Sequence, residues 1–317
     1  MMRIIALGFF LTLLAACHTT RSLNFESMES IQPLQETERL ITTLASDEMQ
    51  GRNVGTAGIE KAAVFIETYL REAGVNPFFG ETFRDEFTSG STLTNNIVGI
   101  IPGTDKSIEK EYILIGAHYD HLGMIDNSED MVYNGANDNA SGVTAVLQMA
   151  TAAAKFTPRR SILIALFSAE EKGIQGSAHL AEKLEREGIK PLCVINMEMV
   201  GKTLTDQPGK VYMTGYKKSN MAQELNDLAG DEFVRFLESE SRYALFYRSD
   251  NFPFFKKMNI PSHTFSSFDF TNYKYYHQPG DEVEQLDLPN MNNIIHKMTF
   301  ALLKLANEDQ PGIQLND

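Results

Sequence analysis

The 317-residue sequence predicts a single α/β domain of three layers, in which a largely parallel, mixed β-sheet is flanked by helices on both faces. Three observations predict this fold class. Short runs of consecutive apolar residues, which are typical of strands buried on both faces, recur along the chain. Segments with apolar residues at helical spacing separate these runs. No internal repeat, low-complexity tract or linker rich in Pro, Gly or Ser divides the chain.

The expected elements follow from these two patterns. Strands are expected at the apolar runs 96–101, 112–117, 161–167 and 192–196. Helices are expected from about residue 34 and at 59–73, 141–155, 177–187 and 291–306. Because helices separate the strands from 112 onwards, neighbouring strands are expected to run parallel.

The N-terminus is typical of an export signal. Arg3 supplies a positive start, and the apolar run 4–14 that follows is too short to span a bilayer as a permanent helix. The run ends in Leu14-Ala15-Ala16-Cys17, which resembles the bacterial lipobox. This resemblance implies a lipoprotein signal peptide over 1–16, lipid attachment to Cys17, and an exported bacterial cell-envelope protein that faces the periplasm or lies at the outer membrane. The alternative is an ordinary secretory signal followed by a chance cysteine.

The remaining boundaries are compositional. The polar composition of residues 17–32 predicts a flexible tether. The folded domain is expected over 33–308, and a frayed tail over 309–317. Cys193 is the one cysteine left after Cys17, so no internal disulfide is expected. Because Cys193 lies in an apolar run, we expect a buried, inert thiol.

The overall charge excludes one class of partner. The chain is 43% hydrophobic and 22% charged, as in an ordinary globular protein, and its formal net charge is −14. No basic run offsets this charge, so we expect no nucleic-acid partner. For the same reason, contact with a membrane is expected only through the N-terminal lipid anchor.

Acids and histidines gather where the predicted strands end, which is where ligands bind in open α/β sheets. The residues are His118 and Asp120 after 112–117, Asp138 at the start of the next helix, Glu170 and Glu171 after 161–167, Glu198 after 192–196, and His277 in a downstream loop.

Each of these residues also has an ordinary structural explanation. Asp138 could cap a helix, Glu170 and Glu171 could begin a solvated helix, and a single histidine could be a hydrogen-bonded structural residue. Together, however, the carboxylates would repel one another, and no Lys or Arg cluster lies nearby in the sequence. One or two divalent metal ions would neutralise them. Imidazole and carboxylate ligands suit zinc, although cobalt or manganese could use the same set.

The chain resembles the co-catalytic dizinc aminopeptidases, relatives of aminopeptidase Y and the bacterial leucyl aminopeptidases, from about residue 34 to the last helix. The matching segments are His118-Tyr119-Asp120, Gly135 to Gly142, Glu170-Glu171-Lys172-Gly173, Asn196 to Gly201 and Tyr276-His277, with weaker likeness at Gly51-Arg52 and Ser249-Asp250-Asn251. The resemblance implies the zinc-exopeptidase fold. It also implies two Zn²⁺ ions with a bridging water, and peptide substrates with a free N-terminus that lose one residue.

The resemblance also implies a role for each residue. Asp138 would bridge the two metals, His118 and Glu198 would complete one site, and Glu171 and His277 the other. Glu170 would be the general base rather than a ligand. Asp120 would lie behind His118 and orient its ring.

The chain departs from the family at one ligand, because Glu198 stands where the family usually has aspartate. Metal binding is expected to survive, since a carboxylate is kept, but metal preference could change. Three other functions stay open. They are a single-zinc glutaminyl cyclase on the same fold, a carboxypeptidase that reads a substrate carboxylate with Arg248, and a non-catalytic receptor-like relative.

Several residues have no assigned metal role. His121 and His179 are two of them, and His263 either lines the substrate pocket or is a hydrogen-bonded core histidine. An aromatic cluster is expected to form either part of an apolar pocket for the N-terminal side chain or ordinary core: Phe265, Phe268, Phe270, Tyr273, Tyr275 and Tyr276.

Overall fold

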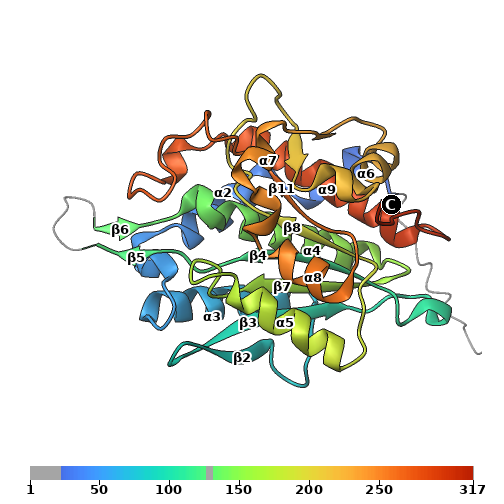
Figure 1. The fold of residues 1–317 in the computed structure, drawn as a ribbon, viewed down its shortest axis with the longest axis horizontal. Helices are drawn as coiled ribbons and strands as arrows, with labels where there is room; N and C mark the ends of the chain where they lie inside the picture. Colours follow the sequence, from blue (N-terminus) through green and yellow to red (C-terminus); the bar gives the residue numbers. More distant parts are fainter. Residues whose placement is uncertain (1–22, 126–130, 317) are drawn as a thin grey trace, which may run out of the picture.

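The computed structural model describes residues 23–125 and 131–316 and contains a mixed β-sheet between two layers of helices (Figure 1). The strands are β1 (Asn76–Pro77), β2 (Arg84–Ser89), β3 (Thr92–Ile101), β4 (Tyr112–His118), β5 (Gly123–Met124), β6 (Val132–Tyr133), β7 (Ser161–Phe167), β8 (Cys193–Met197), β9 (Val211–Met213), β10 (Val234–Arg235) and β11 (Ser262–Ser266). The α-helices are α1 (Glu26–Ile31), α2 (Leu34–Leu44), α3 (Ala57–Glu72), α4 (Gly142–Phe156), α5 (Gln175–Arg186), α6 (Met221–Ala229), α7 (Ser239–Tyr243), α8 (Asn251–Met258) and α9 (Leu288–Asn307). Shorter helical turns are η1 (Asp47–Arg52), η2 (Lys106–Ile108), η3 (Ala136–Ser141), η4 (Tyr216–Lys218), η5 (Leu245–Tyr247) and η6 (Val283–Gln285).

The centre of the sheet is parallel and is bounded on each side by an antiparallel pair, while the outermost pair β9–β10 is again parallel. The order is β1-β3-β7-β4-β8-β11-β9-β10, with β2 paired to β3. The pairs β7–β4, β4–β8 and β8–β11 are parallel, whereas β3 is antiparallel to β7 and β9 to β11. The predicted fold class is confirmed, and the expected parallel pairing holds for the strands at the centre.

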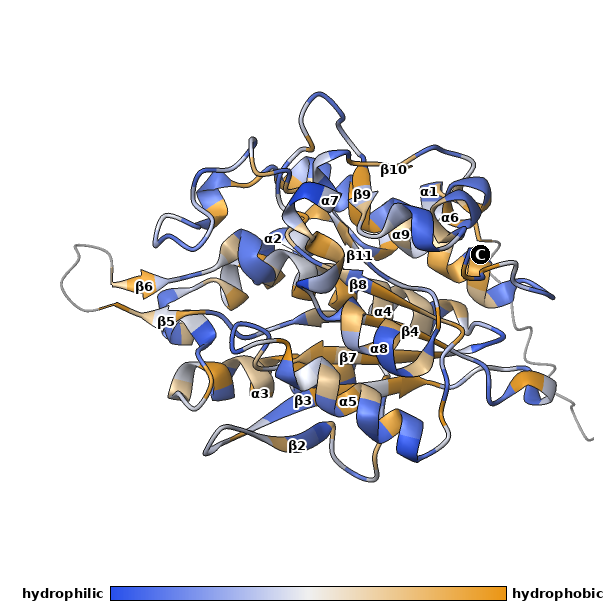
Figure 2. Cartoon of the chain, in the orientation of Figure 1, coloured by the Kyte–Doolittle hydropathy of each residue, from blue (hydrophilic) through white to orange (hydrophobic). Residues whose placement is uncertain are grey.

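Alternate residues of β4, β7 and β8 pack on opposite faces, which explains why the sequences of these strands are mostly apolar. In β4, Ile113 and Ile115 join the core formed with α2, α3, α4, α6 and α9, while Leu114 joins the core formed with α5 and α8. Figure 2 shows these strands as an orange centre with hydrophilic residues on the outer sides of the helices. None of the helices in the described ranges is long and apolar enough to cross a membrane.

The predicted tether is wrong from residue 26 onwards. Helix α1 packs its Met28 and Ile31 into the larger core, although most of the segment is polar. Gln32 is fully buried, and its carbonyl oxygen accepts a hydrogen bond of 2.8 Å from Nε2 of His296 on α9. Two apolar residues three positions apart are too few to predict a helix from the sequence.

The described part of the expected tail contacts the domain at both of its ends, since Asp309 contacts Arg159 and Arg160, and residues 314–316 contact residues 217–220. Leu315 forms a β-bridge with Ser219, and the backbone of Gln314 hydrogen-bonds to that of Asn220. The backbone N–H of Gln314 also donates to Oδ1 of Asn220 at 2.8 Å. The segment is therefore ordered near its end, in contrast to the expected frayed tail.

The strand β11 and the helices α6 and α8 were not predicted. Strand β11 has the sequence Ser-His-Thr-Phe-Ser and is fully buried, so its polar side chains must be hydrogen-bonded within the protein. His263 shows this, because its ring contacts the carbonyl oxygen of Thr214 and the hydroxyl of Ser219, both at 2.7 Å. His263 is therefore a core histidine. An apolar-run criterion cannot find a strand of this kind.

Met28 provides a test of the correction at the N-terminus. Met28→Ala is expected to lower the free energy of unfolding by about 2–5 kcal/mol, because it removes a fully buried side chain from the core. The matched control is Glu29→Ala on the exposed face of α1, with an expected change within about 0.5 kcal/mol. Urea denaturation measures both, and equal stability of the two variants would mean that α1 is a tether after all.

Candidate metal centre

The sheet brings the predicted residues together because β4 lies between β7 and β8 with all three strands parallel. His118, the last residue of β4, pairs with Phe167 of β7, so the turn that carries Glu170 and Glu171 leaves the sheet beside it. On the other side, Gly116 pairs with Asn196 of β8, two residues before Glu198. The strand ends therefore deliver one histidine and three carboxylates to the same edge, as the sequence predicted.

Asp138 is held at this edge by a neighbouring carboxylate that sequence reasoning missed. Asp281 accepts hydrogen bonds from the backbone N–H groups of Asn137 and Asp138, at 2.7 and 3.0 Å. The hydroxyl of Tyr273 donates to the same carboxylate at 2.6 Å. The Asp138–Asn139 peptide bond is cis. Asp281 therefore fixes the backbone on which Asp138 stands.

The polar residues around Asp138 tie η3 to the loop that follows β8. Asn139 accepts from the backbone N–H of Met199, and Ser141 from that of Val200, both at 3.0 Å. Gly142 lies so close to the carbonyl oxygen of Met197 that any Cβ would collide with it. The run from Asn137 to Gly142 thus has a structural cause, since it sets the position of Asp138 relative to Glu198.

Asp138 contacts a histidine through each of its carboxylate oxygens. Its Oδ1 lies 3.4 Å from Nε2 of His118, and its Oδ2 lies 3.2 Å from Nε2 of His277. Nε2 of His277 also lies 3.4 Å from Oε1 of Glu171. The structure therefore joins His118, His277 and Glu171 around one central carboxylate.

The charges at the site perturb one another strongly. Burial opposes protonation of His118, but its hydrogen bond to Asp138 and the charges of nearby acids raise its pKa well above the usual value. Burial also opposes protonation of His277, yet Asp138 and Glu171 raise its pKa to about 10. In turn the two histidines outweigh the effect of burial on Asp138 and lower its pKa. The histidines and Asp138 therefore each favour the charged form of the other.

Glu170 differs from these ligand candidates. Burial raises the pKa of its carboxyl group well above the usual value, and the charges of Glu198, Asp250 and Glu171 add to the rise, opposed by His118. It makes no ion pair with any histidine in the described ranges. A buried carboxyl with a raised pKa is suited to proton transfer.

Asp120 contacts both His118 and the turn that carries Glu170 and Glu171, although not in the expected way. Nδ1 of His118 donates to the main-chain oxygen of Asp120 at 3.1 Å and lies 3.8 Å from its carboxylate. The carboxylate instead accepts from the backbone N–H groups of Glu170 and Glu171, at 3.0 and 3.3 Å. Asp120 therefore orients His118 with its backbone and the Glu170–Glu171 turn with its side chain.

Glu198 reaches the same edge, but its carboxylate contacts a hydroxyl group rather than a histidine. It accepts a short hydrogen bond from Ser249, whose oxygen in turn accepts from Asn196 and Thr264, each at 2.9 Å. Burial raises the pKa of Glu198, while the charge of His118 opposes the rise. Glu198 thus belongs to the charged cluster and has its own hydrogen-bonded support.

Two further charged residues at the site were not assigned from the sequence. Arg52 is almost fully buried and donates to four backbone carbonyl groups, those of Leu44, Tyr119, Asn134 and Gly135. It fixes the loops on either side of the cluster. The signal available was the Gly51-Arg52 pair, which matched the family but suggested no contact.

Asp250 is the second of these residues. Its side chain is fully buried, and neither carboxylate oxygen has a hydrogen-bond partner of ordinary geometry in the described ranges. Burial raises its pKa to about 7, with the charges of Glu198 and Asp120 adding to the rise and His118 and Ser177 opposing it. Asp250 therefore adds to the negative charge near Glu198 when it is ionised.

The residues around Asp138 fit divalent zinc. Ligand atoms at zinc bond lengths of about 2.0–2.1 Å in a tetrahedron lie about 3.3 Å apart. The three distances that join Asp138, His118, His277 and Glu171 are 3.2–3.4 Å. Imidazole nitrogens and carboxylate oxygens are ligands that zinc accepts. His121, Asp138 and Glu171 also form a group compact enough to hold a metal ion.

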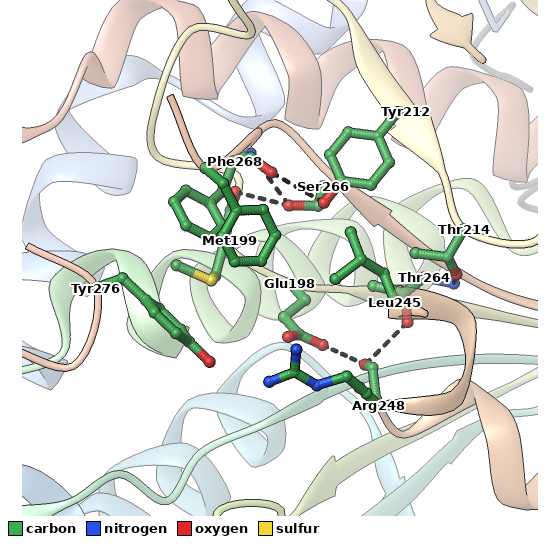
Figure 3. Close-up of a pocket in the computed structure, with 12 residues that line it drawn as sticks. Glu198, Met199, Tyr212, Thr214, Leu245, Arg248, Thr264, Ser266, Phe268 and Tyr276 are labelled. Carbon is green, nitrogen blue, oxygen red and sulfur yellow. Dashed lines mark hydrogen bonds between the residues drawn. The ribbon is translucent and has the colours of Figure 1, made fainter. Parts of the chain in front are cut away.

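A small pocket of about 50 Å³ opens beside Glu198 (Figure 3). Met199, Leu245, Phe268 and Phe270 are apolar lining residues of this pocket. Arg248 lies near Glu198 in Figure 3. Of the predicted aromatic cluster, Phe268, Phe270 and Tyr276 line this pocket, whereas Phe265 is core. Arg248 makes no ion pair within the described ranges.

Curated relatives match parts of the chain. A probable zinc metalloprotease of Pyrenophora tritici-repentis is 31% identical over 168 residues, which cover 50% of this chain and 37% of that protein. A probable leucine aminopeptidase of Trichophyton verrucosum is 26% identical over 251 residues, covering 74% of this chain and 61% of that protein. Three of the fungal relatives, all described as probable zinc metalloproteases, align with this chain over only 26–37% of their own length.

Solved structures share the fold. A zinc aminopeptidase from Bacillus subtilis superposes with a TM-score of 0.70 at 18% identity, covering 92% of this chain and 98% of that chain. A glutaminyl cyclase from Porphyromonas gingivalis does so with a TM-score of 0.64 at 17% identity, covering 86% and 98%. The sequence profile of peptidase family M28 matches residues 96–301, which include every residue of the candidate metal centre from His118 to His277. The chain therefore belongs to peptidase family M28.

Proposed function

We propose that this protein is a zinc aminopeptidase that binds two zinc ions and removes the N-terminal residue of peptides. The observation that supports this most strongly is the position of Asp138, which contacts His118 with one oxygen and His277 with the other. A carboxylate arranged in this way can bridge two ions. His118 and Glu198 would complete the first site, and Glu171 and His277 the second.

Zinc ions at these sites would supply Lewis acidity at the scissile carbonyl group and lower the pKa of water. The remaining steps fall to the protein. Glu170 would accept a proton from the attacking water and return it to the leaving amine, since its carboxyl group has no competing ion pair with a histidine. Asp120 would hold Glu170 in place through the backbone N–H at 3.0 Å.

The substrate class follows from the surroundings of the site. The free α-amine of a peptide is a cation, and Glu198 places a carboxyl group at the pocket beside which that amine would lie. The pocket of about 50 Å³ has apolar lining residues, so we assign it to the side chain of the N-terminal residue. The relative from Trichophyton verrucosum, described as a probable leucine aminopeptidase, supports this assignment.

The glutaminyl cyclase and carboxypeptidase alternatives fit less well. A single-zinc cyclase needs one complete ligand set, whereas here Asp138 contacts histidines on both sides. A carboxypeptidase needs a cation that reads the substrate carboxylate. Arg248 lies at the pocket, but Glu198 lines the same pocket and would repel a carboxylate placed beside it. Both alternatives are outcomes of the assay below.

The proposed reaction is tested with a panel of aminoacyl-p-nitroanilides and zinc-loaded protein. We expect release of p-nitroaniline by the parent, and a loss of kcat of about 10²–10⁴-fold in Glu170→Gln, because the general base is removed. Glu182→Gln, which removes an exposed carboxylate on α5, is the matched control and is expected to keep full activity. Cyclisation of N-terminal glutamine or release of C-terminal residues in place of nitroanilide cleavage would contradict the proposal.

The role of Glu198 is tested by counting zinc. Glu198→Ala is expected to bind about one zinc per chain and the parent two, because one site loses its carboxylate. Glu198→Asp keeps a carboxylate and is expected to retain two. Elemental analysis after gel filtration measures all three proteins. Equal zinc content in the parent and Glu198→Ala would remove Glu198 from the ligands.

We also propose that the protein is exported and attached to a membrane by lipid on Cys17. The support is the sequence of residues 1–17, which lies outside the described residues. In a bacterial host grown with a labelled fatty acid, the parent is expected to carry label and to sediment with membranes. Cys17→Ser is expected to lose both properties. Sedimentation of unlabelled Cys17→Ser with membranes would mean that something other than lipid attaches the protein.

A further inference from the structure

His121 lies against the metal centre, although neither the sequence pattern nor the family resemblance gives it a role. It ends the segment His118-Tyr119-Asp120-His121 and its side chain is fully buried. Its Nδ1 lies 2.9 Å from Oε1 of Glu171. The question is whether His121 is a metal ligand itself or a group that positions one.

The distances favour positioning. Nε2 of His277 lies 3.2 Å from Asp138 and 3.4 Å from Glu171, close to the spacing of about 3.3 Å for two ligands of one tetrahedral zinc. Nδ1 of His121 lies 3.9 Å from Asp138 but only 2.9 Å from Glu171. The longer distance exceeds the ligand spacing, and the shorter one is the ordinary length of an N–H···O hydrogen bond.

The ring of His121 is fixed by its surroundings. Gly135 adopts a left-handed conformation with φ of 57°, and a Cβ there would lie 2.5 and 2.7 Å from two carbons of the ring. Nε2 has no hydrogen-bond partner in the described ranges, so Nδ1 is the nitrogen that donates. A ring seated in this way can hold the Glu171 carboxylate in one orientation.

We propose that His121 is a positioning residue for the second metal site, and that it donates its Nδ1–H to the Glu171 carboxylate. This rests on the two-metal centre proposed above. The backbone N–H of Glu171 is already fixed by Asp120 at 3.3 Å. One four-residue segment thus supplies a ligand, His118, and fixes both the backbone and the side chain of another, Glu171. Outer partners of this kind typically change metal affinity by about 10–100-fold.

Zinc affinity separates the possibilities without an activity measurement. His121→Phe keeps a ring but removes the donor, whereas His121→Asn places an amide N–H near the position of Nδ1. In competition with a chromophoric chelator, we expect His121→Phe to bind the second zinc about 10–100-fold more weakly, with the first unchanged. His121→Asn is expected to recover most of this loss. The control is His179→Phe, which removes a histidine that contacts Asp85 at 3.3 Å rather than any residue of the candidate metal centre. This variant is expected to bind two zinc ions with the affinity of the parent.

Three results would overturn the inference. Unchanged affinity in His121→Phe would show that the hydrogen bond does not position Glu171. Equal loss in His121→Phe and His121→Asn would indicate that His121 is itself a ligand. Weakening of both sites together with a lower melting temperature would indicate a packing role. Fewer than two zinc ions in the parent would contradict the two-metal centre itself, and this is visible before any variant is compared.

Discussion

The constraint on which the structure depends is the burial of several carboxylates at one edge of the sheet. Asp120, Asp138, Glu170, Glu171 and Glu198 converge there, the charge of Asp250 adds to the raised pKa of Glu170, and the charge of Asp138 adds to the raised pKa of Asp281. Buried negative charge is costly unless it is paired or hydrogen-bonded. Most of these carboxylates therefore have a partner, whereas Glu170 and Asp250 have no ion pair in the described ranges. Asp120 and Asp281 accept backbone N–H groups, Asp138 and Glu171 contact imidazoles, and Glu198 accepts from a hydroxyl group. Divalent cations would supply the remaining positive charge.

The same requirement explains features of the fold that would otherwise look unfavourable. Arg52 is buried, which lowers its pKa to about 10, while the charges of Asp281, Asp138 and Asp120 oppose this. Its guanidinium group donates hydrogen bonds to backbone carbonyl groups, including those of Tyr119 and Asn134, and so fixes the two loops that contain them. Residues with left-handed backbone conformations also flank the centre, among them Arg52, Ala169, Met199 and His277. Unusual backbone conformations of this kind gather at functional sites, where the surrounding structure holds them in place.

The fold alone does not choose between the chemistries found in its structural neighbours. An aminopeptidase and a glutaminyl cyclase both superpose on this chain over most of its length. Function must therefore be argued from the site. Here the informative features are the two-sided contacts of Asp138 and the freedom of Glu170 from histidine partners in the described ranges. Glu198 adds a local variation, because its longer side chain is supported by Ser249, Asn196 and Thr264 instead of a direct histidine contact.

The sequence by itself determined the central strands and the acids and histidines at their ends. Strands β4, β7 and β8 are buried on both faces and so are mostly apolar, which makes them recognisable as apolar runs, and the polar residues that follow each run mark the edge of the sheet. Strand β11 and helix α1 could not be predicted from the sequence, because β11 is polar and hydrogen-bonded and α1 buries only two residues. Only the tertiary structure decided the pairing of His121 with Glu171, the complete burial of Asp250 and the contacts of Arg52. These depend on residues 50 or more positions apart, or on backbone groups, and neither leaves a pattern in local sequence.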